Sequence, residues 1–322
     1  MKRMIAMSGL LLMVLICSSW GFLIHRTINQ LAIYELPEPM RYYFHDHIQY
    51  IVKYSVRPDQ RRNDDPQEAP KHFIDLELFG DSAAWKMPLK WEAAVRRYGK
   101  DSLLHCGYVP YYIMTVKDRL TAAFKSGQSD SILFYATDLA HYIGDAHVPL
   151  HVSENYDGQL TGQKGLHSLW ETMIPEIELN QYDLRSKHKA HYLKQPEKAV
   201  WKAIRQSWVL LHDVFEQEKE VSKSFTDSTK YRVQQRNGRE WKSYTSAFAK
   251  AYSARLGKTI NKRLVASANL VADFWYTCWV DAGCPALTTT KKKENNLQQE
   301  WHAFKHNKLI EKKLLIARQG EE

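Results

Sequence analysis

The sequence predicts an all-α protein built as a single helical domain. Apolar residues recur at every third or fourth position along most of the chain, which is the period of an amphipathic helix. Alternating apolar and polar residues bounded by turn residues, the pattern of a strand, are scarce. With 322 residues, 44% of them hydrophobic, the chain is long enough for one large core or for two domains. No internal repeat is visible, and we expect one domain over residues 20–287 followed by a charged tail over residues 288–322.

Residues 1–19 have the composition of a secretory signal peptide. Lys2 and Arg3 form a basic start, a short apolar run follows, and Cys17 stands with two serines before the expected cleavage point. That run is too short for a membrane-spanning helix, and no later stretch is apolar enough, so we expect no transmembrane segment. We therefore expect an exported protein, periplasmic or extracellular, whose mature chain begins at Trp20. Acylation of Cys17 is the alternative, and it would anchor the protein to a membrane.

The helical spacing is clearest in residues 24–34, 40–54, 103–125, 129–147, 196–223 and 256–280. Pro149 should end the fourth of these helices, because proline lacks the N–H that the next helical turn needs. Residues 153–165 contain three glycines among Asn, Asp and Gln, which is typical of a loop. A new helix is expected near Leu166. In the tail, residues 309–317 could form a short helix.

The cysteines and the charge give weaker indications. Cys278 and Cys284 are close enough in sequence to form a disulfide in an oxidising compartment, and Cys106 is expected to be a buried thiol. The formal net charge is +9. A basic surface favours phosphate-bearing ligands, but it is also common among solvated exported proteins.

One window of the chain concentrates residues that bind metal ions. His141 and Asp145 are four positions apart, as are His167 and Glu171, and His151 lies between the two pairs. On a helix with 3.6 residues per turn, each such pair projects from one face. Imidazole and carboxylate together are ligands of Zn²⁺. The window therefore predicts a zinc site between the end of one helix and the start of the next. Ordinary surface and core histidines are the alternative, which two such pairs in one window disfavour.

Further ligands are expected upstream of this window. His72 lies in the segment KHFID, after a polar stretch that contains Asp59, Asp64 and Asp65. Any of these aspartates could join His72 at a metal ion; the alternative is that the stretch is a charged surface loop. His25 lies in the first turns of the first predicted helix.

The arrangement resembles the superfamily that holds zinc-dependent phospholipase C and the single-strand-specific zinc nucleases of fungi and plants. The motifs that carry the resemblance are WGFLIH at residues 20–25, DQRR at 59–62, HFID at 72–75, HYIGDAHVPLH at 141–151 and HSLWE at 167–171. Among these motifs, the succession HxxxD, then His151, then HxxxE at this spacing is the most specific to the superfamily.

The resemblance implies a cleft that holds three Zn²⁺ ions. The implied ligands are Asp59, His72, His141 and Asp145 for the first ion, His151, His167 and Glu171 for the second, and His25, Asp145 and the α-amino group and carbonyl of Trp20 for the third. Asp145 would therefore bridge two ions. Asp59 is preferred to Asp64 and Asp65, because the family places this ligand further from the histidine that follows. Only cleavage before Trp20 would free the amine.

The resemblance also implies hydrolysis of phosphodiesters. Zinc suits this reaction, because it lowers the pKa of a bound water toward neutrality and so makes hydroxide available. Arg62 stands where the nucleases have an arginine near the phosphate, so that Arg62 and Asp59 are the implied catalytic residues. The alternative is that Arg62 belongs to a surface run of arginines. Phe73 and Asp75 stand where the nucleases stack on a base and pair with its edge, although Phe73 could equally be core packing.

These positions favour a nuclease or 3′-nucleotidase that acts on single-stranded nucleic acid or nucleotides. Glu171 favours a different substrate, because the phospholipase branch has glutamate where the nucleases usually have aspartate. The first alternative is therefore a zinc-dependent phospholipase C that hydrolyses phospholipid headgroup esters. The second alternative is a zinc-stabilised binding protein without activity. We expect a monomer in each case.

Overall fold

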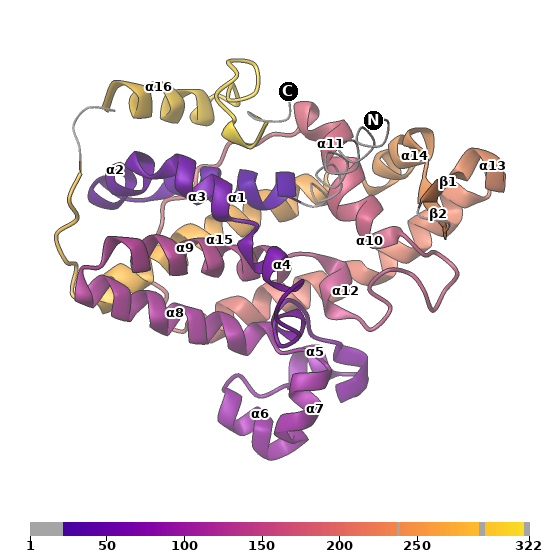
Figure 1. Ribbon diagram of the computed structural model, residues 1–322, viewed down its shortest axis with the longest axis horizontal. Coiled ribbons are helices and arrows are strands. Elements are labelled where there is room, and N and C mark those ends of the chain that lie inside the picture. Colours follow the sequence, from indigo (N-terminus) through magenta and orange to yellow (C-terminus); the bar gives the residue numbers. More distant parts are fainter. Residues whose placement is uncertain (1–21, 237–238, 290–293, 319–322) are drawn as a thin grey trace, which may run out of the picture.

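The computed structural model describes residues 22–236, 239–289 and 294–318, and over these residues the protein is an all-α fold (Figure 1). The prediction of the fold class is confirmed. The α-helices are α1 (Phe22–Glu35), α2 (Glu38–Asp46), α3 (Ile48–Tyr54), α4 (Arg57–Arg61), α5 (Ala83–Lys86), α6 (Trp91–Tyr98), α7 (Lys100–His105), α8 (Val109–Ser126), α9 (Ser129–Asp145), α10 (Leu166–Ser168), α11 (Ile174–Glu178), α12 (Pro196–Ser222), α13 (Asp227–Lys230), α14 (Ser246–Leu256), α15 (Thr259–Asp281) and α16 (Glu294–Lys305). Short 3₁₀ turns are η1 (Ala69–Lys71), η2 (Leu76–Phe79), η3 (Pro149–Val152), η5 (Leu179–Gln181) and η7 (Ile316–Arg318), and η4 (Leu169–Met173) is a π-helical turn.

The centre of the molecule is formed by α15, which packs against α1, α8 and α9. Figure 1 shows α8 and α9 side by side, with α15 behind them and α1 above. Trp275 of α15 is fully buried, its ring stacks on Phe44 with centroids 4.6 Å apart, and its indole N–H donates to the carbonyl of Ala136 at 3.0 Å. Burial of such large rings is the main stabilising contribution. Both α1 and α9 pack on α15, and they also contact each other.

Two of the predicted helices are each divided in two. The segment 40–54 breaks at His47, between α2 and α3, where the ring Nδ1 donates to the carbonyl of Tyr43 at 2.9 Å. The segment 103–125 breaks between α7 and α8, at Gly107. The φ angle of Gly107 is +83°, and a Cβ there would lie 2.4 Å from the carbonyl oxygen of Phe73. Only glycine fits this close approach.

The hairpin of β1 (Tyr231–Arg236) and β2 (Arg239–Tyr244) was not expected from the sequence. The strands are antiparallel, with Tyr231 opposite Tyr244, and these two rings lie 5.0 Å apart. The Tyr244 hydroxyl donates to the Glu218 carboxylate of α12 at 3.0 Å. The hairpin therefore depends on contacts with a distant helix, which a local pattern does not contain.

The C-terminal residues 294–318 pack onto the helical core. Their helix, α16, covers residues earlier than the expected 309–317, and it contacts α1 and α2. Phe304 and Leu309 are buried in the same core as α1. The Glu300 carboxylate accepts hydrogen bonds from the Tyr34 hydroxyl at 2.8 Å and from the His45 ring at 3.0 Å.

The expected disulfide is absent, because Cys278 and Cys284 are both free thiols. Cys278 is buried in α15, where burial raises the pKa of its thiol to about 12, whereas Cys284 is exposed. Cys106 is a buried free thiol, as predicted. None of the helices in the described residues has both the length and the apolar character that a membrane crossing requires.

Candidate metal centre

The predicted ligands come from helices and turns that surround the amino-terminal end of α1 and the carboxyl end of α9. His141 and Asp145 occupy the last turns of α9, which ends before Pro149 as expected. His151 follows in η3, and His167 begins the next helical segment after the loop 153–165. Pro149 and this loop therefore bring two parts of one sequence window to the same place.

The first group consists of four donor atoms with nearly uniform spacing. The Nδ1 of His72 lies 2.9 Å from Asp145 Oδ2 and 3.7 Å from Asp59 Oδ1. The Nε2 of His141 lies 3.5 Å from Asp145 Oδ2, 3.6 Å from Asp59 Oδ1 and 3.2 Å from His72 Nδ1. Ligand atoms bound at 2.0–2.1 Å to a tetrahedral Zn²⁺ lie about 3.3–3.4 Å from one another. The five distances given among these four atoms, 2.9–3.7 Å, lie close to the spacing of ligands around one zinc ion.

The second group consists of His151, His167 and Glu171. The Nε2 of His167 lies 2.8 Å from Glu171 Oε2, and the Nε2 of His151 lies 3.4 Å from the same oxygen. All three donor atoms lie within 4.8 Å of one another. The π-helical turn η4 carries Glu171, and such turns are frequent at functional sites.

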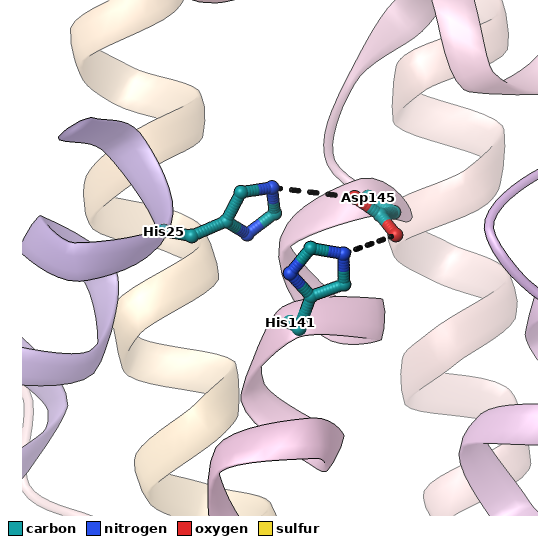
Figure 2. Close-up of side chains that lie close together, drawn as sticks. All are labelled: His25, His141 and Asp145. Carbon is teal, nitrogen blue, oxygen red and sulfur yellow. Dashed lines mark ion pairs between the residues drawn. The ribbon is translucent and has the colours of Figure 1, made fainter. Parts of the chain in front are cut away.

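His25 lies between the two groups. Its Nε2 is 3.5 Å from Asp145 Oδ1 (Figure 2), while the other oxygen of Asp145 belongs to the first group. The same Nε2 is 3.3 Å from Glu171 Oε1, while the other oxygen of Glu171 belongs to the second group. Asp145 therefore has the geometry of a bridging carboxylate. The two oxygens of Glu171 likewise face different imidazoles.

Backbone carbonyls fix the orientation of two imidazoles. The Nδ1 of His141 donates to the carbonyl of Ser55 at 2.9 Å, and the Nδ1 of His151 donates to the carbonyl of His72 at 2.7 Å. A carbonyl only accepts, so in both rings the hydrogen is on Nδ1 and Nε2 is left to bind a metal.

The donor set fits zinc. The Nε2 of His141 and the Nδ1 of His72 face each other at 3.2 Å, an arrangement that needs a proton or a cation between the two nitrogens. Burial alone would lower the pKa of His141, but Asp145 and Asp59 raise it. The same balance, with Asp145 and Glu171 as neighbours, raises the pKa of His151 to about 9. Divalent ions at the donor atoms would supply this positive charge in place of protons.

A buried acidic residue behind His72 was missed in the sequence. Glu68 accepts hydrogen bonds from Lys71 at 2.6 Å, from Arg61 at 3.1 Å and from the Tyr142 hydroxyl. Its Oε1 lies 3.6 Å from His72 Nε2. Burial opposes ionisation, but the hydrogen bonds from these neighbours lower the pKa of Glu68. The spacing of four residues between Glu68 and His72 was the available signal.

A cleft of about 540 Å³ opens onto the ligands. Its walls include Asp59, Asp145, His151, His167 and Glu171, together with Phe22, Arg62 and Asn63. A cavity of about 510 Å³ elsewhere contains none of the ligands, so volume alone does not identify the site.

Arg62 lies at the edge of this cleft. Its guanidinium Nη1 is 3.6 Å from Asp59 Oδ1, and the side chain is 47% exposed. Asp65 faces elsewhere, toward Lys71 at 3.7 Å, and Asp64 is not part of the group that contains Asp59 and His72.

Phe73 and Asp75 do not line the cleft itself. Phe73 is half-buried and packs against Gly107, and its carbonyl accepts from the amide of Val109 at 3.1 Å. Burial, aided by the nearby carboxylates of Glu77 and Glu154, raises the pKa of Asp75 to about 7. The predicted ligand Trp20 lies outside the described residues.

Comparison with known proteins assigns the family. No curated protein matches the chain. The model of the family described as S1/P1 Nuclease matches residues 20–273, which include every predicted ligand, Trp20 among them. With this match over most of its length and with the donor groups that the structure brings together, the chain belongs to the S1/P1 nuclease family.

Proposed function

We propose that the mature protein is an exported, zinc-dependent phosphodiester hydrolase that cleaves single-stranded nucleic acid and 3′-nucleotides. The observation that supports this most directly is the placement of Asp145. One of its oxygens lies in the first donor group and the other faces His25, at the floor of an open cleft. Binding of three ions, with Asp145 as a bridge, is part of the proposal.

The chemistry divides between the metal and the side chains of the cleft. Zinc held there would make a water nucleophilic at neutral pH and would polarise the phosphate oxygens. Asp59, His72 and His141 would hold one of these zinc ions. Arg62, at the edge of the cleft, would bind the phosphate and stabilise the negative charge that develops on its oxygens. The proton that the attacking water loses would pass through solvent in the open cleft to the leaving oxygen, so no histidine is needed as a general base.

The nucleic-acid side of the proposal rests on the family and on two residues beside the site. Phe73 directly follows His72, and Asp75 follows two positions later. Phe73 would stack on a base, which is a sequence-tolerant contact typical of single-strand recognition. A carboxyl with a pKa raised to about 7 would present Asp75 partly protonated near neutrality, able to donate as well as accept at a base edge.

Phospholipase C activity is the second candidate, and Glu171 is the observation that favours it. The phospholipase branch has glutamate where the nucleases usually have aspartate, and here the two oxygens of Glu171 face His25 and His167 respectively.

A two-substrate assay on the purified mature protein separates these candidates. We expect hydrolysis of single-stranded DNA or RNA and of a 3′-nucleotide, with no release of phosphocholine from phosphatidylcholine. Phosphocholine release without nuclease activity would overturn the nuclease and establish the phospholipase. Bound zinc without turnover of either substrate would support the remaining candidate, a zinc-stabilised binding protein without enzymatic activity.

The amine of Trp20 is proposed as a ligand and has its own test. A protein that begins at Trp20 should retain one more zinc ion than the same protein with an alanine added before Trp20, because the added residue removes the free amine. Equal zinc content and equal activity in the two proteins would exclude this ligand.

A further inference from the structure

A second cluster of metal-binding side chains lies outside the candidate metal centre. It consists of His188, His191 and Asp273, whose donor atoms all lie within 4.8 Å of one another. None of these residues lines the cleft described above. Asp273 belongs to α15, whereas both histidines belong to the extended segment 183–193, which has no regular secondary structure.

Both imidazoles converge on one carboxylate oxygen. The Nε2 of His188 lies 2.8 Å from Asp273 Oδ1, and the Nδ1 of His191 lies 2.9 Å from the same atom. The amide of His191 also donates to this oxygen at 2.9 Å. Asp273 itself is buried, so its charge is poorly screened by solvent.

The polypeptide around the cluster is held in place. The amide of Leu193 donates to the Thr277 hydroxyl of α15 at 3.0 Å, and the amide of Ala190 donates to the carbonyl of Glu35 at 3.0 Å. These bonds lie on both sides of His191 in the sequence. The two histidines are therefore presented to Asp273 by a segment that is tied to the core at several points.

A cavity of about 350 Å³ adjoins the three side chains. Its other walls include Gln206 and Lys202. The ammonium of Lys202 disfavours a cation, and so does that of Lys305, whose charge acts on His188. The cavity leaves room for water to complete a coordination shell. Three protein donors with an open position are the usual arrangement of a zinc site that keeps water.

We propose that His188, His191 and Asp273 form a separate binding site for a divalent transition-metal ion of the zinc class. Two imidazole nitrogens and one carboxylate select zinc-like ions over Mg²⁺, which prefers oxygen ligands and water. On binding, the hydrogen on Nε2 of His188 and that on Nδ1 of His191 leave these nitrogens for the other ring positions. The ion would then lie between these two nitrogens and Oδ1 of Asp273, where the two hydrogens were.

The test counts zinc ions. The full mature protein is dialysed, its retained zinc is measured by mass spectrometry, and further binding is followed by equilibrium dialysis against Zn²⁺. The variants His188→Ala and His191→Ala are compared with the wild type. His212→Ala, which removes an exposed histidine from α12, is the matched control.

We expect the wild type and His212→Ala to bind one more ion in total than either cluster variant, or to bind that ion at least about tenfold more tightly. Mg²⁺ should not compete. Because the His191 side chain is 61% exposed, its removal should leave the thermal unfolding temperature unchanged. Identical zinc totals and affinities in all four proteins would overturn the site and leave a hydrogen-bonded cluster. The count does not depend on any substrate, so its outcome is independent of the proposed nuclease activity.

Discussion

At the scale of single residues, Asp145 is the candidate ligand whose carboxylate lies between different imidazoles of the centre. It is buried at the end of α9, and its two oxygens face different imidazoles. Burial opposes its ionisation, but His141 and His151 lower the pKa of the carboxyl. A buried carboxylate in such surroundings is stable only with positive charge on both sides.

Replacement of Asp145 by asparagine should therefore affect two ions at once. We expect Asp145→Asn to lower kcat/KM for phosphodiester cleavage by at least about 100-fold and to reduce the zinc content. Metal analysis and steady-state kinetics check this. Asp130→Asn, an exposed position in the first turn of the same helix, is the control. Retained zinc with normal kinetics would show that Asp145 is not a bridging ligand.

Replacement of Phe73 should weaken substrate binding without changing the zinc content. Phe73→Ala should raise KM for single-stranded substrates by about tenfold, which is the loss of one base-stacking contact of about 1–3 kcal/mol, while zinc content stays normal. Kinetics and metal analysis on the same preparation provide both values. Loss of zinc would mean instead that the ring is structural, since it packs against Gly107 next to the ligand His72.

The residues that the sequence predicted are those with a repeated chemical spacing. His141 with Asp145, and His167 with Glu171, are four apart on helices, and in the structure their donor atoms lie 3.5 Å and 2.8 Å apart. Glu68 was missed although it stands four residues before His72, because the stretch around it also contains other acidic residues that point to solvent. Which carboxylate turns inward depends on the fold around Tyr142 and Arg61, which no local pattern contains.

At the scale of elements, the long helices were predictable and their ends were less so. The helices α9 and α12 follow the apolar periodicity closely, because tertiary packing requires a continuous apolar face. The break at Gly107 arises from the approach of the segment that carries Phe73, a contact between elements distant in sequence. The β1–β2 hairpin was missed for the same reason, since Tyr244 is held by Glu218 of α12.

Gly144 shows how the packing of two helices serves the centre. It lies in the last turn of α9, where a Cβ would be 2.9 Å from the Nδ1 of His25 on α1. Glycine is less favourable than alanine inside a helix by about 1 kcal/mol. Its presence here is explained by the space that the ring of His25 occupies.

The variant Gly144→Ala should accordingly displace His25. The gain in helix propensity of about 1 kcal/mol offsets only part of an overpacking cost of about 1–3 kcal/mol, so the free energy of unfolding should fall by about 0–2 kcal/mol. Activity should fall by about tenfold or more as His25 moves away from Asp145. Ala136→Gly, a destabilising change in the same helix, should keep its activity in the folded protein. Unchanged activity in Gly144→Ala would show that the position of His25 is not critical.

At the scale of the whole molecule, the tail and the metal centre are joined through α1. This helix carries His25 near its start and Tyr34 near its end. The ring of Tyr34 lies 5.3 Å from that of Phe304 in the tail, and the Tyr34 hydroxyl donates to Glu300. The sequence showed only a charged tail, because the few apolar residues that pack inward, such as Phe304 and Leu309, are separated by many lysines and glutamates.

The last prediction concerns this contact between the tail and the core. Phe304 is fully buried, so Phe304→Ala should lower the free energy of unfolding by about 3–5 kcal/mol, which chemical denaturation measures. Lys312→Ala, at an exposed position of the same tail, should change it by no more than about 0.5 kcal/mol. If the two variants were equally stable, the tail would not be part of the core. Because α1 links Phe304 to His25, the destabilised protein should also lose zinc at a lower denaturant concentration than the wild type, and the zinc loss should coincide with unfolding of the tail.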